Sequence, residues 1–212
     1  MNNNAVQLSE IGHRYGKVWG LSKTSLTIRQ GECIALLGPN GCGKTTLLKI
    51  LATRLEPTRG EGKILGFDLR CNKDPIRLQV EWLGHELGLY KTLTASENLI
   101  FSLHLRGQKN AKQKIGESLE KVGLFKEAGK QVHTFSTGMC KRLSLARMLL
   151  QNPSLVLLDE PHANLDKEGK ALMNTCIQEW KKKGATIVFS SHDHPELYPY
   201  CDRTITLWGS SL

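Results

Sequence analysis

An apolar strand, a glycine-rich loop and a helix follow one another between residues 33 and 54, and no other stretch limits the fold as strongly. Residues 33–37 are Cys-Ile-Ala-Leu-Leu, and residues 47–51 continue an apolar pattern that is typical of a helix. The loop between them consists of Gly38, Pro39, Asn40, Gly41, Cys42, Gly43, Lys44, Thr45 and Thr46. It fits the phosphate-binding pattern G-x-x-x-x-G-K-[ST], in the strand–loop–helix setting that the pattern requires. The order predicts an α/β chain in which this loop holds a triphosphate.

The residue types of the loop suit phosphate binding. Glycines at 38, 41 and 43 allow the backbone to curl, so that N–H groups point inward, and the helix N-terminus adds unpaired donors and the positive end of its dipole. Lys44 offers a full charge to the β- and γ-phosphates, and the Thr45 hydroxyl is a candidate ligand of Mg²⁺. The alternative is a glycine-rich turn that binds nothing.

Two adjacent acids close a second apolar strand. Residues 155–158 are Leu-Val-Leu-Leu, without polar alternation, which indicates a strand covered on both faces, as in a parallel sheet. Asp159 and Glu160 follow at its carboxyl end, where the ligand sites of open α/β sheets lie. Asp159 can hold Mg²⁺ through water, and Glu160 can orient or deprotonate an attacking water. A lone pair of acids is more often a surface turn, but the position behind a buried strand favours a catalytic role.

Three further positions have more than one interpretation. Tyr15 precedes the loop and can stack on an adenine or pack half-buried on its strand. Ser136 precedes an apolar helix expected over 140–150; it can simply cap that helix or, with Thr137 and Gly138, form a second phosphate site. His192 follows a buried strand on the same side as the acids. It can hydrogen-bond the γ-phosphate, or belong to a helix-capping cluster or a His-x-His metal site.

Composition narrows the class of protein. The 212 residues predict one compact unit with a helical lobe at about 89–150. The net charge of +9 comes from scattered Lys and Arg, so no nucleic-acid surface is expected, and the run 181–183 is expected to be a solvated helix end. Six cysteines without C-x-x-C spacing indicate a reducing cytosol. No apolar run approaches the ~20 residues that cross a bilayer, so work at a membrane would need a partner.

Taken in order, these motifs resemble those of the ATP-binding-cassette (ABC) ATPases over nearly the whole chain. Residues 38–45 match the Walker A loop, 155–160 the Walker B strand with its catalytic Glu160, 164–166 the D-loop, His192 the switch histidine and Tyr15 the adenine-stacking tyrosine. Residues 135–139, Phe-Ser-Thr-Gly-Met, resemble the signature Leu-Ser-Gly-Gly-Gln. The resemblance implies a P-loop ABC cassette with an antiparallel β subdomain and an inserted helical lobe, and ATP and Mg²⁺ as cofactors.

The same resemblance implies an assembly. Two cassettes would pair head to tail as a homodimer, with each ATP between the Walker A loop of one chain and residues 136–138 of the other, and with Asp166 of the D-loop near the nucleotide. Integral-membrane transporter subunits would contact the helical lobe. The chain is therefore expected to be peripheral, at the cytoplasmic face of the inner membrane.

Two departures from the family pattern bear on the cargo. Met139 replaces the signature glutamine and Thr137 one signature glycine. His85 stands where the family places a glutamine, and it is a further candidate ligand of Mg²⁺. Around it, residues 83–89 and 93–99 resemble the ATP-binding subunits of the haem exporters of cytochrome c maturation, which implies a role in haem handling.

Other functions remain open from the sequence. The same ATPase could serve a different exporter, for example of a drug or a lipid. A soluble nucleic-acid-associated ATPase is a third alternative, although the chain lacks tandem repeats, a coiled-coil insertion and a basic–aromatic stripe. A small-molecule kinase would need an acceptor pocket and would have no use for the Ser136 motif.

Overall fold

The computed structural model describes residues 3–108, 112–163, 165–191 and 199–208, and the chain forms two compact units. The first unit contains Met1–Gly84, Pro153–Pro161 and Ile177–Leu212, and the second contains His85–Asn152 and His162–Cys176. The division falls within helix α6 (Lys167–Lys182), so this helix contributes residues to both units.

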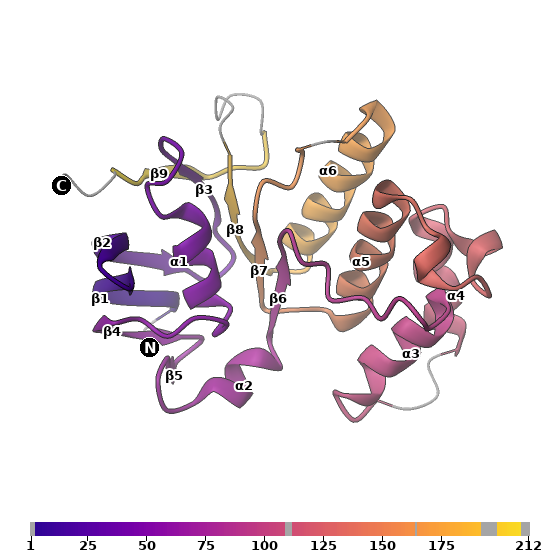
Figure 1. Cartoon of the computed structure of the whole chain (residues 1–212), viewed down its shortest axis with the longest axis horizontal. Coiled ribbons are helices and arrows are strands. Elements are labelled where there is room, and N and C mark those ends of the chain that lie inside the picture. Colours follow the sequence, from indigo (N-terminus) through magenta and orange to yellow (C-terminus); the bar gives the residue numbers. More distant parts are fainter. Residues whose placement is uncertain (1–2, 109–111, 164, 192–198, 209–212) are drawn as a thin grey trace. The chain divides into compact units, whose positions relative to one another are not determined.

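A four-stranded antiparallel sheet forms part of the first unit, with the strand order β2-β1-β4-β5 (Figure 1). Its strands are β1 (Asn4–Tyr15), β2 (Val18–Arg29), β4 (Arg59–Ile64) and β5 (Phe67–Asp68). The register of β1 against β4 shifts between Ser9 and Gly12, and Glu10 between them has a φ of 49°, which indicates a β-bulge. Gly60 is needed opposite the bulge because a Cβ there would lie 2.4 Å from the Glu10 carbonyl oxygen.

The second sheet of this unit is parallel throughout, with the strand order β6-β7-β8-β3-β9. Its strands are β3 (Cys33–Leu37), β6 (Val80–Leu83), β7 (Leu155–Leu158), β8 (Thr186–Ser190) and β9 (Arg203–Thr206). Every residue of β7 and β8 is buried, as expected for central strands covered on both faces. Because the strands are parallel, the residues that follow β3, β7 and β8 leave the sheet at the same edge.

Helix α1 (Lys44–Leu51) shares one hydrophobic cluster with residues of both sheets. Its Leu47 and Leu48 are fully buried in a cluster that includes Val6 of β1, Ile34 of β3 and Leu157 of β7. A short helix, α2 (Lys73–Arg77), leads into β6. The loop before α1 is therefore held between a buried strand and a buried helix.

The second unit is helical. It contains α3 (Ala95–His104), α4 (Lys112–Lys121) and α5 (Thr137–Gln151), with short 3-10 turns η1 (Phe125–Glu127) and η2 (Val132–Thr134). Helix α3 begins with a capping box, in which Thr94 Oγ1 accepts from the Glu97 amide at 3.2 Å and a Glu97 carboxylate oxygen accepts from the Thr94 amide at 2.7 Å. The loop before α3 is fixed by Asn98, whose buried side chain accepts from the amide of Tyr90 and donates to its carbonyl.

The predicted combination of an antiparallel sheet with a parallel α/β sheet is confirmed, but one local prediction was wrong. The helix expected from residue 140 begins at Thr137, because Ser136 caps it directly. The basic run 181–183 lies at the exposed end of α6, as predicted, and Lys181 in addition donates to the Tyr200 carbonyl at 2.6 Å and pairs with Asp202 at 2.7 Å. Long-range contacts of this kind leave no signal in a local charge run.

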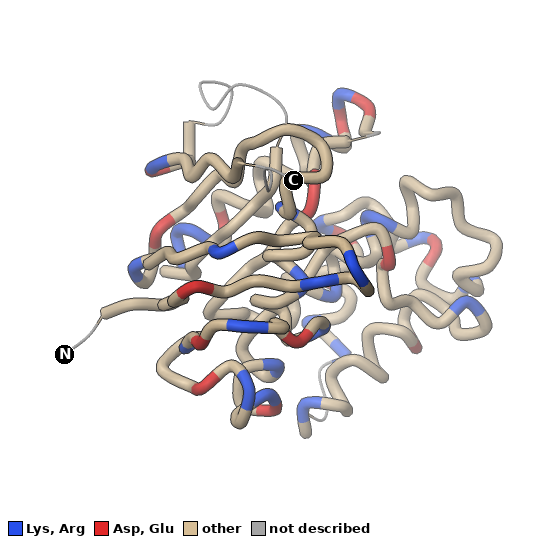
Figure 2. The backbone as a smooth tube through the Cα atoms, turned by 60° about the vertical axis from the view of Figure 1, so that its left-hand side comes forward, with Lys and Arg blue, Asp and Glu red and all other residues tan. Residues whose placement is uncertain are grey.

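Two findings concern the surface and the thiols of the described residues. Lys and Arg are spread among Asp and Glu along both units, as Figure 2 shows. All six cysteines are free thiols, and burial raises the pKa of Cys33 to about 12. In the part of the chain that the structure describes, no helix is long and apolar enough to span a bilayer.

Candidate active site

The glycine-rich loop needs its glycines for two physical reasons. Gly38, Gly41 and Gly43 have φ values of 141°, 78° and 106°, a region of backbone conformation that favours glycine. A Cβ at Gly38 would also lie 2.3 Å from the carbonyl oxygen of Leu207, and a Cβ at Gly43 would lie 2.7 Å from that of Gly20. The curled backbone predicted from the sequence is therefore present, and it lies against two neighbouring segments of the first unit.

Lys44 is buried at the start of α1, with an exposed fraction of 6%. Its ammonium donates to the carbonyls of Gly38 and Pro39, at 2.7 and 3.2 Å, so it lies along the loop. The N-cap residue of α1 is Gly43, which contributes no capping side chain, so the helix N-terminus adds its dipole and its first amides to this charge. A buried cation beside a helix N-terminus suits an anionic ligand.

The two acids at the end of β7 are joined by one serine on the neighbouring strand. Thr45 Oγ1 donates to Asp159 Oδ1 at 3.0 Å, and Ser190 Oγ donates to the same oxygen at 2.8 Å. Ser190 Oγ also accepts from the Glu160 amide at 2.8 Å. Glu160 has a φ of 49°, which is uncommon outside glycine and often marks functional sites. Residues from α1, β7 and β8 thus meet at the edge where the parallel strands end.

The residues beside Asp159 fit a magnesium ion. Asp159 is 8% exposed, and its Oδ2 is buried without a hydrogen-bond partner in the described part of the chain. A buried acceptor of this kind costs about 1–3 kcal/mol when unsatisfied, so it favours a cation or a water as its partner. A carboxylate and a hydroxyl are oxygen donors that Mg²⁺ prefers, and Mg²⁺ usually takes few protein ligands. No group of three metal-ligating His, Cys, Asp or Glu occurs among the described residues.

Tyr15 ends β1 beside the same loop. A Cβ at Gly20 would lie 2.5 Å from the Tyr15 ring and 3.5 Å from the hydroxyl of Thr46, so the ring covers Gly20 close to the start of α1. The ring packs edge-on against His13, with centroids 4.5 Å apart, yet 49% of the residue is exposed. Tyr15 is thus half-exposed beside the loop, and adenine stacking stays a prediction.

In the second unit, Ser136 caps helix α5, and its role in a second phosphate site stays a prediction. Its Oγ accepts from the Met139 amide at 3.2 Å, which is ordinary helix capping. Ser136, Thr137 and Gly138 are nevertheless exposed at the N-terminus of α5. Since the serine oxygen accepts in the cap, its own proton can still be donated to an anion.

The loop before α6 has a structural role that the sequence did not predict. Asp166 Oδ1 accepts from the Gly169 amide at 2.7 Å and caps α6. Lys141 of α5 donates to the Ala163 carbonyl at 3.2 Å, so the same loop is tied to the helix that Ser136 begins.

Two predicted positions are not placed at the site. His192 of the predicted γ-phosphate contact and Asn164 of the predicted D-loop lie outside the described residues. His85 is exposed and begins the second unit, so its role as a magnesium ligand stays a prediction.

Comparison with known proteins decides the family. A family model described as "ABC transporter" matches residues 21–163, which include the loop, the signature-like segment and both acids. The chain belongs to the ABC transporter family. The predicted ATP-binding subunit with ATPase activity is thereby confirmed at the level of this family.

Several curated ABC proteins have similar sequence identity to this chain, although their names refer to different transport functions. NatA of Bacillus subtilis is 36% identical over 191 residues, covering 89% of this chain and 78% of that protein. The cytochrome c biogenesis export protein CcmA of Bordetella bronchiseptica is 34% identical over 192 residues, covering 91% and 86%. The bacitracin transport protein BcrA of Bacillus licheniformis is 36% identical, covering 93% and 65%. The chain spans less than two thirds of several other relatives, for example 64% of YxlF of Bacillus subtilis.

Solved ABC structures confirm the fold. A dimeric, post-hydrolysis structure of the ATP-binding cassette MJ0796 bound to ADP and Pi has a TM-score of 0.86 and 25% identity, covering 97% of each chain. An ATP-binding subunit of an ABC transporter has a TM-score of 0.88 and 26% identity, covering 98% of this chain and 88% of that one. The predicted P-loop ABC cassette is therefore confirmed, whereas the cargo is not identified by these similarities.

Two residues of the candidate active site were not predicted from the sequence. Ser190 joins both acids, and Gly20 allows Tyr15 to lie beside the loop. The signal for Ser190 was its place at the end of a buried strand, because the carboxyl ends of parallel neighbours meet at one edge. No sequence pattern indicated Gly20, which depends on a contact between β1, β2 and α1.

Proposed function

We propose that this chain is the ATP-hydrolysing subunit of a transporter that handles haem during the maturation of c-type cytochromes. The observation that carries the cargo assignment is the similarity to CcmA, which extends over 86% of that protein and 91% of this chain. The segment around His85, which resembles haem-exporter subunits, supports the same cargo. An exporter of a drug or another compound is the second candidate, since BcrA is 36% identical and CcmA 34%.

The proposed chemistry assigns one task to each group at the candidate active site. The curled loop amides and Lys44 bind the β- and γ-phosphates, and Tyr15 stacks on the adenine. Thr45 and Asp159 hold Mg²⁺, which when bound neutralises charge on the phosphates. Glu160 orients the attacking water and takes its proton, and Ser190 fixes the backbone that carries this glutamate.

The proposed assembly is a head-to-tail homodimer in which Ser136, Thr137 and Gly138 of one copy face the nucleotide held by the other. Their exposure at a helix N-terminus supports this role, because such a site offers amides and a hydroxyl to phosphate. The dimeric MJ0796 structures offer a precedent. Contact with integral-membrane subunits through residues 89–150, attachment at the cytoplasmic face of the inner membrane and the absence of a nucleic-acid partner belong to the same proposal.

The ATPase part is tested with Glu160→Gln. We expect kcat for ATP hydrolysis to fall at least about 100-fold, because a general base contributes about that much, and we expect ATP with Mg²⁺ to convert the variant to a stable dimer in light scattering after gel filtration. Glu61→Gln, an exposed glutamate on β4, is the matched control and should behave as the parent. A Glu160→Gln protein that hydrolyses ATP at the parental rate would remove the general-base assignment.

The cargo part is tested in cells of the source organism. A strain carrying Lys44→Ala should lose c-type cytochromes and keep b-type cytochromes, measured by haem staining and reduced-minus-oxidised spectra. Lys49→Ala, an exposed lysine on the same helix, is the control. Normal c-type cytochromes in the Lys44→Ala strain, with its ATPase activity abolished, would leave the ATPase assignment intact and favour the second candidate.

A further inference from the structure

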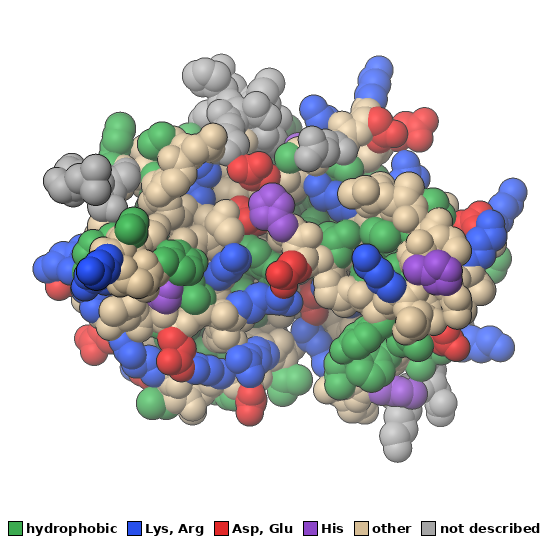
Figure 3. All heavy atoms as spheres, viewed as in Figure 1, with side chains coloured by type: hydrophobic (Ala, Val, Ile, Leu, Met, Phe, Trp, Pro, Cys, Tyr) green, Lys and Arg blue, Asp and Glu red, His purple; other side chains and the backbone are tan. Residues whose placement is uncertain are grey.

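Exposed hydrophobic side chains gather on the second unit. They are Tyr90, Ile100, Phe101, Leu105 and Phe125, with exposed fractions between 36% and 67%. Figure 3 shows hydrophobic side chains gathered at the surface in the region of α3. Exposed apolar patches often mark binding sites.

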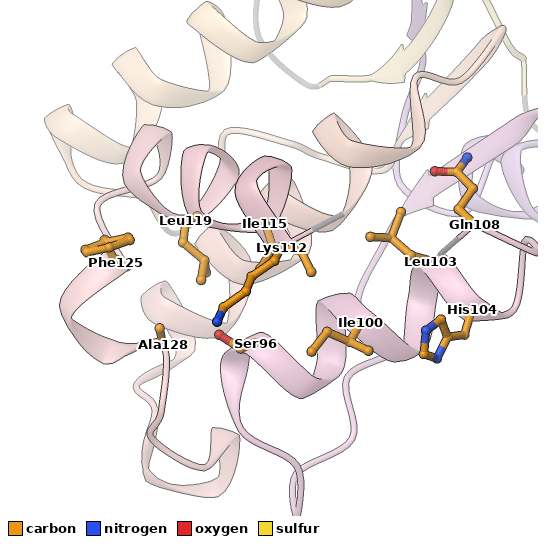
Figure 4. Close-up of a pocket in the computed structure, with 11 residues that line it drawn as sticks. Ser96, Ile100, Leu103, His104, Gln108, Lys112, Ile115, Leu119, Phe125 and Ala128 are labelled. Atoms are coloured by element: carbon orange, nitrogen blue, oxygen red, sulfur yellow. The ribbon is translucent and has the colours of Figure 1, made fainter. Parts of the chain in front are cut away.

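Between α3 and α4 this surface is hollowed into a pocket of about 410 Å³. Its floor is formed by Leu103, Ile115 and Leu119, which are buried, and its rim by Ile100 and Phe125, which are exposed (Figure 4). All lining residues belong to the second unit. The volume lies within the range of about 300–1,000 Å³ that is typical of small-molecule sites.

The polar groups of the pocket select for negative charge. Lys112 of α4 extends across the opening, with its ammonium directed toward Ser96 of α3, and His104 stands at the other side (Figure 4). Among the described lining residues there is no Asp or Glu. The cavity therefore combines apolar walls with four polar side chains, those of Lys112, Ser96, His104 and Gln108, of which Lys112 carries a full positive charge.

Gly116 supports the view that the space is functional. It lies inside α4, where glycine costs about 0.5–1 kcal/mol relative to alanine. A Cβ there would meet Phe125 at 3.6 Å, an ordinary contact, and the residue is not among those with positive φ. Neither crowding nor backbone conformation requires glycine here, and a side chain larger than that of alanine would extend into the pocket that Gly116 lines.

We propose that this pocket binds a small amphiphile with one anionic group, of the class of medium-chain carboxylates. The carboxylate lies at Lys112 and Ser96, and the alkyl chain lies between α3 and α4 against Leu103 and Leu119. A concave apolar site with a single cation at its edge matches a free small molecule better than a flat membrane surface. The inference does not depend on the proposed ATPase chemistry or cargo, but the pocket lies within residues 89–150, so it assigns this part of the second unit to a small molecule and not to the proposed contact with membrane subunits.

The test is binding of decanoate to the full chain, below its micelle concentration, followed by isothermal titration calorimetry and by methyl signals of α3 and α4 in NMR. Intrinsic fluorescence would not report, because Trp19, Trp82, Trp180 and Trp208 all lie in the first unit. We expect saturable binding of one decanoate, weaker binding of decanol and none of decylamine.

Paired variants make the test specific. Lys112→Met should weaken decanoate binding about tenfold, the loss expected for a hydrogen bond to a charged group, while Lys114→Met, an exposed lysine two residues along α4, should not. Gly116→Leu should abolish binding by filling the pocket, whereas Gly116→Ala should keep it; circular dichroism checks that both are folded.

Three outcomes would overturn the proposal. They are equal binding of decanoate and decylamine, unchanged binding in a folded Gly116→Leu variant, and association with anionic phosphatidylglycerol vesicles without saturable binding of free decanoate. The last result would assign the surface to a membrane instead.

Discussion

Ser190→Ala tests how the candidate active site is held together. Ser190 is fully buried at the end of β8, where its Oγ donates to Asp159 Oδ1 and accepts from the Glu160 amide, both at 2.8 Å. The substitution removes the acceptor of the Glu160 amide and one of the two donors that Asp159 Oδ1 has. It changes no residue of the glycine-rich loop.

The expected size of the effect follows from these two contacts. A buried polar group that loses its partner costs about 1–3 kcal/mol, so the free energy of unfolding should fall by roughly 2–4 kcal/mol. Glu160 also holds a left-handed conformation, which is kept only where its surroundings enforce it. A small displacement of a catalytic group costs up to about 100-fold in rate, so kcat should fall between about 10-fold and 100-fold. The KM for ATP should change little, because Lys44 and the loop keep their contacts.

The matched control is Thr186→Val on the same strand. Thr186 is 1% exposed, and its Oγ1 accepts from the Gly31 amide at 3.0 Å, so the substitution also removes a buried hydroxyl acceptor. It should lower the free energy of unfolding in urea by about 1–2 kcal/mol and leave kcat unchanged at saturating ATP and Mg²⁺. If both variants lost stability and Ser190→Ala kept the parental kcat, the argument that Ser190 positions Glu160 would be refuted.

Two further predictions concern contacts that do not involve Asp159 or Glu160. Lys141→Met should lower kcat several-fold with little change in melting temperature, because it frees the loop at Ala163 from α5. Steady-state kinetics measures this change, with Lys170→Met, at an exposed lysine on α6, as the control. Equal kcat values in the two variants would count against the prediction. Asp202→Asn should remove an acid-sensitive part of stability. Burial alone would raise the pKa of Asp202, but hydrogen bonds from Lys181 and the Cys33 amide, with the Lys181 charge, hold it below its ordinary value. Its contribution, roughly 1 kcal/mol or less because solvent screens the half-exposed pair, is complete above about pH 4 and is lost as the pH falls below that. Urea unfolding as a function of pH should therefore show a flatter acid limb for Asp202→Asn, and parallel curves would contradict the assignment.

Local signals predicted the parts of the site that depend on neighbouring residues in the chain. The loop before α1 follows from its glycines and its lysine, since the curl and the helix N-terminus are encoded within a few residues. The capping box at Thr94 and Glu97 is a local feature of the same kind, because its two residues are only three positions apart. The unbroken apolar run before Asp159 predicted a covered parallel strand, and β7 is fully buried.

The parts that were not predicted depend on contacts between distant segments. Ser190 acquires its role because β8 lies beside β7, and the strand order places these segments together. Lys181 lies at the exposed helix end that the sequence predicted, but its ion pair with Asp202, 21 residues further along the chain, was not predicted. Strand order and long-range side-chain partners depend on the tertiary structure, for which a single sequence carries no local pattern.

The backbone between the two acids explains how consecutive residues can serve one site. Along a regular strand, successive side chains point to opposite faces of the sheet, so adjacent acids on a continuing β7 would diverge. The strand ends at Leu158, and the φ of 49° at Glu160 takes the backbone out of the extended conformation directly after Asp159. This change removes the Glu160 amide from the sheet's hydrogen-bond ladder, and the Ser190 hydroxyl supplies the acceptor that the ladder no longer provides. Because the same hydroxyl donates to Asp159, the residue that permits the turn also fixes the carboxylate beside it, and the two acids are positioned as one unit.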